Sequence, residues 1–298
     1  MKLTVFTPTY NRGYLIEKLY NSLVVQTFKN FEWLIVDDGS TDDTEELCQQ
    51  FIKEKKLRIK YEKQNNGGKH RAINNGVKKA TGELFFIVDS DDQLVENALE
   101  RIIFYYDKIR DNNDIGGICG VKILFSGRPP GGELPFSELT CNSLDFRHKY
   151  HIKGDMAEVF KTDILRDYPF PEYTNEKFCP EVLIWNRIAQ KYKLLYFNEN
   201  IYLCDYLEDG LTKKITNIRM KSPLATMDTY AELFSYDISI IQKMKACINY
   251  WRFSFNTDIS FYRKTKRIKG LFNILCIPIS YLMYLKDSHE TKFNQKMI

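Results

Sequence analysis

Three apolar segments in the N-terminal third of the chain each end in a cluster of polar side chains. Residues 3–7, 31–36 and 84–88 are mostly β-branched, aliphatic or aromatic, which is typical of buried strands. Segments with helical spacing lie between them, and this alternation favours a mostly parallel, doubly wound α/β sheet. Such sheets bind ligands beyond the carboxyl ends of their strands. We therefore expect three clusters to share one site: Pro8-Thr9-Tyr10-Asn11, Asp37-Asp38 and Asp89-Ser90-Asp91-Asp92.

The other elements are predicted from periodicity and from residues that start or stop helices and strands. We expect the first strand to stop at Pro8, and a helix from about residue 41 to be capped by Ser40 or Thr41. Further strands are expected at 58–62 and 115–125, and a strand pair or one extended segment at 194–206. Helices are expected at 14–26, 70–79, 155–167, 181–192, 222–256 and 261–286.

Composition excludes several classes of protein. Of 298 residues, 44% are hydrophobic and 28% charged, which is ordinary for a globular chain with a buried core. A net charge of +4 is too small to indicate a nucleic-acid partner. The seven cysteines are dispersed, without a C-x-x-C pair, and this favours reduced thiols in a cytosolic protein. The apolar N-terminus is too short for a signal peptide, and no apolar run of about 18 residues predicts a membrane span.

Asp89 and Asp91 are the strongest candidates for metal ligands. They lie two residues apart at the end of an apolar strand, where both carboxylates can reach one hard cation such as Mg²⁺ or Mn²⁺. Such an ion neutralises a departing diphosphate. The alternative is an ordinary acidic turn.

Three further segments carry candidate site residues with open alternatives. Asp37 or Asp38 can accept a hydrogen bond from the imide of uracil, or can form an acidic cap to the next helix, and both can hold. Lys69 follows two glycines at a helix start, which suits a phosphate but is also compatible with a plain turn. Glu181 begins a predicted helix, as a general base or as an acidic residue favoured by the helix dipole.

The histidines give no such signal. His70, His148 and His151 show neither triad nor metal-ligand spacing, so we expect them at the surface or at a substrate rim.

Taken together, these segments resemble the family 2 glycosyltransferases with the GT-A fold. The order and spacing match over roughly residues 1–125, and a weaker match continues through 178–187. The matching stretches are Thr7–Arg12 (TPTYNR), Ser22–Phe28 (SLVVQTF), Phe31–Asp42 (FEWLIVDDGSTD), Asn66–Gly76 (NGGKHRAINNG) and Ala80–Asp92 (ATGELFFIVDSDD).

The resemblance implies a transfer of a sugar from a nucleoside diphosphate, UDP by family habit, to an acceptor hydroxyl, with inversion. It implies that Asp91 ligates the metal, that Asp89 faces the ribose side of the metal site, and that Lys69 lies near the base or phosphates. The remaining roles fall to Pro8, Tyr10 and Asn11 at the base and ribose, to Asp38 with Asp37 at the base, and to Glu181 as catalytic base. The family often has Glu-Asp where this chain has Pro180-Glu181, and the next candidate bases are Asp155, Glu158 and Glu176.

On this resemblance we assign residues 1–215 to a GT-A catalytic domain, with a nucleotide-sugar half at 1–125 and an acceptor half at 126–215. Residues 216–298 form a helical C-terminal region. Within it, a basic cluster precedes the apolar segment 271–285, which is short for a span and favours either peripheral contact with a bacterial membrane through 261–286 or packing on the catalytic domain. The basic cluster comprises Arg263, Lys264, Lys266, Arg267 and Lys269.

Membrane contact would suit a saccharide or lipid-linked saccharide acceptor, and it predicts a cytoplasmic enzyme at the inner face of the membrane. Two other functions are weighed against this one. A sugar nucleotidyltransferase would need a glycine-rich loop after the first strand, where this chain has a single glycine, Gly13. A non-catalytic subunit that binds a sugar nucleotide within a polysaccharide-assembly complex is the other alternative, and the intact set of Lys69, Asp89, Asp91 and Glu181 argues against it.

Overall fold

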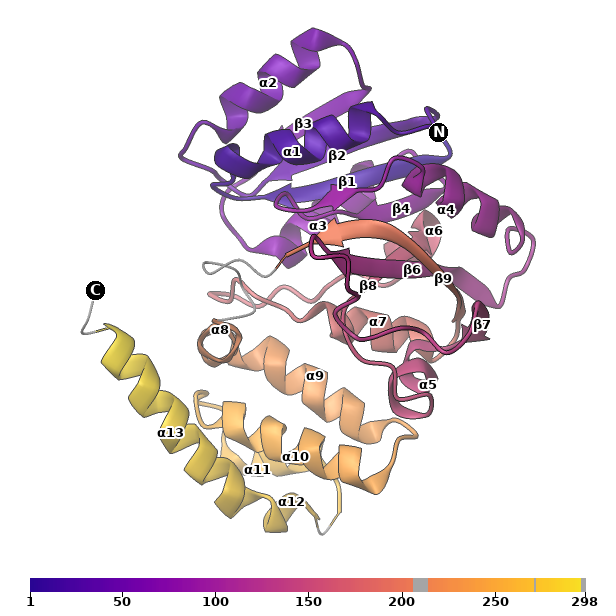
Figure 1. Cartoon of the computed structure of the whole chain (residues 1–298). Coiled ribbons are helices and arrows are strands. Elements are labelled where there is room, and N and C mark those ends of the chain that lie inside the picture. The colour runs from indigo at the N-terminus through magenta and orange to yellow at the C-terminus, as the bar shows by residue number, and fades with distance from the viewer. Residues whose placement is uncertain (206–213, 271, 296–298) are drawn as a thin grey trace. The chain divides into compact units, whose positions relative to one another are not determined.

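A computed structural model describes residues 1–205, 214–270 and 272–295. By internal packing the described chain forms two compact units. The first comprises residues 1–170 and 187–205, and the second comprises 171–186 with the described residues from 214 onward (Figure 1).

A nine-stranded sheet forms the centre of the first unit. Its order is β3-β2-β1-β4-β8-β6-β9-β5, and β7 pairs with β9. The strands are β1 (Leu3–Thr9), β2 (Phe31–Asp37), β3 (Ile59–Lys63), β4 (Leu84–Ile87), β5 (Gln93–Leu94), β6 (Ile115–Leu124), β7 (Glu138–Cys141), β8 (Met156–Lys161) and β9 (Lys193–Cys204).

The predicted α/β class is confirmed, although the sheet is mixed rather than mostly parallel. The strands β3, β2, β1 and β4 run parallel to one another, as the sequence predicts. Beyond β4, the strand β8 runs antiparallel to both of its neighbours, and β5 and β7 run antiparallel to β9. The alternation of strand and helix that signals parallel pairing is confined to the first part of the chain, which explains the difference.

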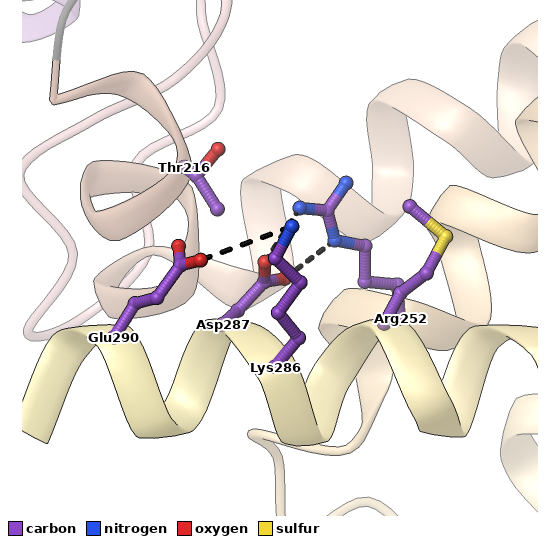
Figure 2. Close-up of a pocket in the computed structure, with 6 residues that line it drawn as sticks. Thr216, Arg252, Lys286, Asp287 and Glu290 are labelled. Carbon is purple, nitrogen blue, oxygen red and sulfur yellow. Dashed lines mark hydrogen bonds and ion pairs between the residues drawn. The ribbon is translucent and has the colours of Figure 1, made fainter.

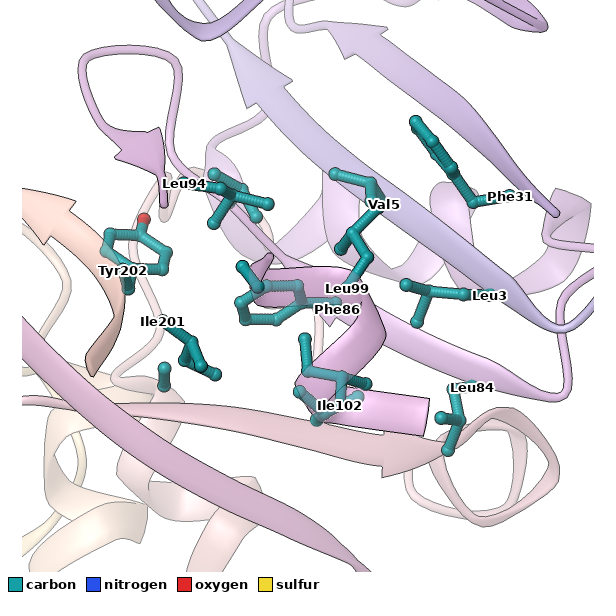
Figure 3. Close-up of a cluster of buried hydrophobic side chains, with 14 of the residues drawn as sticks. Leu3, Val5, Phe31, Leu84, Phe86, Leu94, Leu99, Ile102, Ile201 and Tyr202 are labelled. Carbon is teal, nitrogen blue, oxygen red and sulfur yellow. The ribbon is translucent and has the colours of Figure 1, made fainter. Parts of the chain in front are cut away.

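Helices cover both faces of this sheet. The first unit has α1 (Gly13–Val24), α2 (Thr44–Glu54), α3 (Lys69–Lys79), α4 (Ala98–Asp107), α5 (Ser143–His148) and α6 (Thr162–Asp167). Side chains of α1, α2 and α4 share one apolar cluster with alternate residues of the strands, among them Leu3, Val5 and Phe86 (Figure 3). Phe6 points to the other face, which α3 covers. α3 packs closely here because Gly76 has no Cβ atom; one built at this position would lie 2.1 Å from the Phe6 ring.

Three local predictions are wrong. β1 does not stop at Pro8 but continues to Thr9. The ladder of β1 with β4 ends at Phe6, opposite Ile87, so the missing N–H of Pro8 removes no bond from it. α2 begins at Thr44, and Ser40 instead accepts a hydrogen bond from the Asn11 N–H at 2.8 Å.

The third error lies in residues 155–167, where a strand precedes a short helix. β8 fills residues 156–161 and α6 fills 162–167. Met156, Ala157, Val159 and Phe160 are all buried, so this run lacks the alternation that identifies a strand from sequence. The predicted extended segment near 194–206 is one long strand, β9.

The second unit is helical, as predicted for 222–256 and 261–286. Its helices are α8 (Ile215–Lys221), α9 (Pro223–Ser235), α10 (Ile240–Ser254), α11 (Phe261–Arg267), α12 (Phe272–Leu275) and α13 (Ile277–Gln295), and α7 (Glu181–Ala189) begins in it. Met227, Cys247, Tyr250, Trp251 and Cys276 form its core. Among the described residues, no helix is long and apolar enough to cross a membrane.

Candidate functional site

The residues that follow β4 form the electrostatic centre of the site. Asp89 follows β4 and pairs with Lys69, the first residue of α3, with 2.6 Å between Lys69 Nζ and Asp89 Oδ1. Burial alone would raise the pKa of Asp89, but the positive charges of Lys69 and Lys122 hold it below its usual value. Asp89 is therefore an ionised carboxylate, and about one third of its side chain is exposed.

Asp91 differs from Asp89 because it has no ion-pair partner among the residues that the structure describes. Burial and the neighbouring charge of Asp89 raise its pKa. The positive charges of Arg12 and Lys69 oppose this rise, and a divalent cation between the two carboxylates would relieve their repulsion further.

This donor set fits the metal that the sequence predicts. Carboxylate oxygens are hard ligands suited to Mg²⁺ and Mn²⁺, and a Mg²⁺ site often has one or two carboxylates, waters and substrate phosphates. In the described part of the chain, no three His, Cys, Asp or Glu side chains gather closely enough to hold an ion by themselves. The remaining ligands would come from water and a bound diphosphate.

Two residues that sequence reasoning missed, Tyr202 and Lys122, support this loop from across the sheet. The Tyr202 hydroxyl accepts a hydrogen bond from the Asp89 N–H at 2.9 Å and donates one to Asp92 Oδ2 at 2.7 Å. Lys122 Nζ lies 4.0 Å from the centroid of the Tyr202 ring. Tyr202 stands 113 residues from Asp89 in the long strand β9, and no local motif marks Tyr202 or Lys122.

The charges of this group are interdependent. Burial, followed by the charge of Asp89, raises the pKa of Asp92 to about 7. Burial alone would lower the pKa of Lys122, but the charges of Asp89 and Asp92 raise it. Lys122 thus stays cationic beside the acidic loop.

The carboxylates at the end of β2 have a different environment, because several hydrogen-bond donors surround each of them. Asp37 accepts hydrogen bonds from the Ser40 N–H at 2.7 Å and from the Tyr61 hydroxyl. Asp38 is buried and accepts four, all from residues 64–68. The donors are Gln64 Nε2, Asn66 Nδ2 and the N–H groups of Gly67 and Gly68.

The sequence left open whether Asp37 or Asp38 caps the helix that follows β2. Neither Asp37 nor Asp38 caps α2, since their oxygens bind a turn and a loop. A different carboxylate, Asp42, accepts hydrogen bonds from the Gly13 N–H at the start of α1 and from Thr44 at the start of α2.

The loop after β1 is held against the turn after β2. Asn11 has a left-handed backbone, with φ of 51°, and its side-chain oxygen accepts a hydrogen bond from the Thr41 N–H at 2.8 Å. Tyr10 remains 47% exposed, and Pro8 is buried in the strand. The first two strand ends therefore form one connected rim, with Tyr10 as its accessible aromatic ring.

The structure thus brings most of the predicted site residues to one edge of the sheet. Pro8, Tyr10, Asn11, Asp37, Asp38, Asp89 and Asp91 lie at or just beyond the carboxyl ends of β1, β2 and β4, and Lys69 begins α3 beside Asp89. Glu181 belongs to the second unit, where it is the first residue of α7. Of the two positions expected for His70, the surface is wrong, because its side chain is 2% exposed within α3, and a place at a substrate rim stays a prediction.

Of the alternative bases, Glu176 has a structural role within the second unit. It accepts hydrogen bonds from the N–H groups of Leu224 and Ala225 at 2.6 and 2.9 Å, in the first turn of α9. A carboxylate at this position satisfies N–H groups that the helix leaves unpaired.

Comparison with known proteins identifies the family. Residues 4–161 match the family model for glycosyl transferase family 2. The chain belongs to this family. Its match covers β1 to β8 and so includes every site residue named above at the ends of β1, β2 and β4.

Relatives and solved structures agree with this assignment. Glycosyltransferase GlyG of Streptococcus pneumoniae is 35% identical over 216 residues, which are 67% of this chain and 69% of GlyG. The GalNAc(5)-diNAcBac-PP-undecaprenol beta-1,3-glucosyltransferase of Campylobacter jejuni is 27% identical over 94% of this chain and 88% of its own length. Several other relatives are longer, and the chain spans 37% or less of them.

Among solved structures, residues 1–349 of Staphylococcus aureus TarS in complex with UDP-GlcNAc share the fold. The TM-score is 0.65 at 18% identity, over 100% of this chain and 92% of that one. The predicted GT-A fold with a helical C-terminal region is confirmed by this likeness.

Proposed function

We propose that this chain is a metal-dependent, inverting glycosyltransferase that moves a sugar from a nucleoside diphosphate, most simply UDP, to an acceptor hydroxyl. One observation carries the proposal: the carboxylates of Asp89 and Asp91 lie two residues apart beside Lys69, at the carboxyl edge of a family 2 fold, and Asp91 has no ion-pair partner among the described residues. The UDP-GlcNAc held by the TarS neighbour supports UDP as the first nucleotide to test.

In this proposal each group at the edge has one task. Tyr10, Asn11 and Pro8 border the base and ribose. Asp38, with Asp37 beside it, holds the base, and it does so by ordering the loop of residues 64–68. Lys69, at the N-terminus of α3, binds a phosphate oxygen. Asp89 and Asp91 would hold Mg²⁺ or Mn²⁺, which supplies positive charge against the negative charge of the departing diphosphate.

Glu181 is proposed as the general base that takes the proton of the acceptor hydroxyl. We expect Glu181→Gln to lower turnover by about 10²–10⁴-fold with nucleotide binding unchanged, because an amide cannot accept that proton. Asp155→Asn and Glu158→Gln are the comparison variants. A loss of less than about tenfold in Glu181→Gln, together with a large loss in one of the other two, would move the base to that residue.

The acceptor and the cellular setting are also proposals. The name of the Campylobacter relative includes an undecaprenol-linked acceptor, and this supports a saccharide or lipid-linked saccharide acceptor in bacterial surface polysaccharide assembly. Such an acceptor would place the chain in the cytoplasm at the inner face of the membrane.

The deciding experiment is calorimetric titration of UDP, GDP and dTDP, each with and without Mn²⁺, into wild type and Asp91→Ala. We expect one nucleotide to bind with Mn²⁺ and that binding to be lost in the variant. The matched control is Asp163→Ala, which removes an exposed aspartate from the same unit. If the folded wild type binds no nucleotide in either condition, the proposal is wrong.

An assay of turnover, and not the titration, separates the alternative of a non-catalytic subunit. That subunit would bind a sugar nucleotide with Mn²⁺ dependence, yet it would transfer the sugar to neither water nor any acceptor. Release of UDP from a bound UDP-sugar, measured over time, favours the enzyme.

A further inference from the structure

The last two helices of the second unit carry exposed apolar side chains and buried polar ones. Asn273, Cys276, Ser280 and Asp287 are buried and recur at helical spacing, so they form the inward face of α12 and α13. The opposite face, here called the outer apolar face, is 45% exposed or more at each of its members. It consists of Ile274, Leu275, Ile279, Leu282 and Leu285.

Specific polar contacts fix this orientation. Asn273 Oδ1 accepts a hydrogen bond from the buried Trp251 Nε1 at 2.7 Å. Arg252 on α10 donates two hydrogen bonds to Asp287, at 2.5 and 2.8 Å, in a cavity of about 360 Å³ between α8, α10 and α13 (Figure 2). Turning the apolar side inward would break these contacts, so the outer apolar face remains outward.

Three cations lie on the neighbouring segment of the same unit. Two members of the basic cluster are used internally: Lys264 donates to the Thr257 carbonyl, and Arg267 pairs with Asp228. Arg263, Lys266 and Lys269 are exposed. Two aromatic rings beside them are also exposed, Phe261 at 61% and Tyr262 at 66%.

We propose that the outer apolar face docks on the surface of an anionic lipid bilayer, with Arg263, Lys266 and Lys269 against the headgroups. Exposed aliphatic side chains, aromatic rings and cations within one segment of the chain, from Phe261 to Leu285, match the layered chemistry of that interface. From Ile274 to Leu285 a helix rises about 17 Å, well short of the roughly 30 Å hydrocarbon core, so it lies along the surface. A second copy docking by the same face would bring its own cations toward these.

This surface deepens the proposed action on a lipid-linked acceptor, but it lies wholly in the second unit. The donor site belongs to the first unit. Vesicle binding and nucleotide binding can therefore fail separately, and each can be measured on the same preparation.

The test is co-sedimentation of the full chain with vesicles of phosphatidylcholine mixed with phosphatidylglycerol, and with vesicles of phosphatidylcholine alone. We expect binding to the anionic vesicles, lowered on the order of a hundredfold in the double variant Ile279→Glu, Leu282→Glu. The triple variant Arg263→Gln, Lys266→Gln, Lys269→Gln should lose the preference for phosphatidylglycerol. Val25→Glu, at an exposed valine of the first unit, is the control and should bind as wild type.

Three results would overturn the proposal. If the wild type stays in the supernatant when anionic vesicles sediment, the outer apolar face does not bind lipid. The same holds if the double variant binds these vesicles as well as the wild type does. A wild-type dimer in light scattering that the double variant dissociates, without vesicle binding, assigns this face to a second copy instead. UDP titration of each variant shows whether the donor site is intact.

Discussion

The two strands that flank β1 in the sheet, β2 and β4, end in aspartate pairs that look alike in sequence and differ in the structure. After β2, Asp38 is buried and its two oxygens accept four hydrogen bonds from one loop. After β4, Asp91 lacks an ion-pair partner among the described residues and lies beside the charged Asp89. The lesson is that the donors around a carboxylate, and not its place after a strand, separate a residue that builds the site from one that is available to bind.

Within this comparison, the largest expected effect is on activity, at Asp91. Asp91→Asn should lower kcat/KM by about 10²–10³-fold, because one of two carboxylates that offset the metal's charge is lost. Its free energy of unfolding should stay the same or rise, since the change removes repulsion with Asp89. Steady-state kinetics and urea unfolding measure the two quantities. A variant that is destabilised yet fully active would break the contrast between the two pairs.

The second effect is on stability, at Asp38. Asp38→Asn places an amide N–H₂ against N–H donors of the 64–68 loop, and we expect a loss of about 2–4 kcal/mol in the free energy of unfolding. Urea unfolding measures it, and Asp163→Asn, at an exposed aspartate, is the control. If Asp38→Asn unfolds like wild type but no longer binds nucleotide, Asp38 contacts the ligand and the contrast is lost.

The sequence predicts well that the ends of β1, β2 and β4 form one site, and the reason is physical. Parallel strands that alternate with helices bring their carboxyl ends to one edge, so Asp37 and Asp89 could be placed together without a structure. The sequence also predicts which strands are buried, because an unbroken apolar run such as residues 84–88 indicates a strand that is covered on both faces.

The residues that support the Asp89 loop, Tyr202 and Lys122, could not be predicted from the sequence. Tyr202 and Lys122 reach the Asp89 loop only through the pairing of β6 with β9 and of β9 with β5. That pairing includes shifts in register, which no periodicity reveals. The same limit applies to β8, which resembles a helix until it is placed between β4 and β6.

Tyr202→Phe sharpens the comparison, because it removes hydrogen bonds from the loop after β4 and none from the loop after β2. The ring stays and the hydroxyl is lost, so the Asp89 N–H and Asp92 lose a shared partner. We expect about 1–1.5 kcal/mol less stability and about a tenfold weaker Mn²⁺ activation of transfer. Tyr105→Phe, which loses a hydroxyl bound to Glu199 in the same unit, is the control. Equal Mn²⁺ dependence in both variants would show that Tyr202 stabilises the fold without positioning the loop.

The smallest expected effect tests the backbone beneath the β2 pair. Gly39 has φ of +86°, and a Cβ atom there would lie 3.0 Å from the Asn66 N, in the loop that Asp38 holds. Gly39→Ala should therefore cost about 1 kcal/mol in the free energy of unfolding, from a strained backbone and a tight contact. Gly127→Ala has a similar φ of +83° but meets nothing within 4 Å, so it isolates the backbone term. If Gly39→Ala costs more than Gly127→Ala and weakens nucleotide binding, close packing of this turn on the loop is part of the donor site. If the two variants cost the same and binding is unchanged, the β2 pair supports the fold through Asp38 alone.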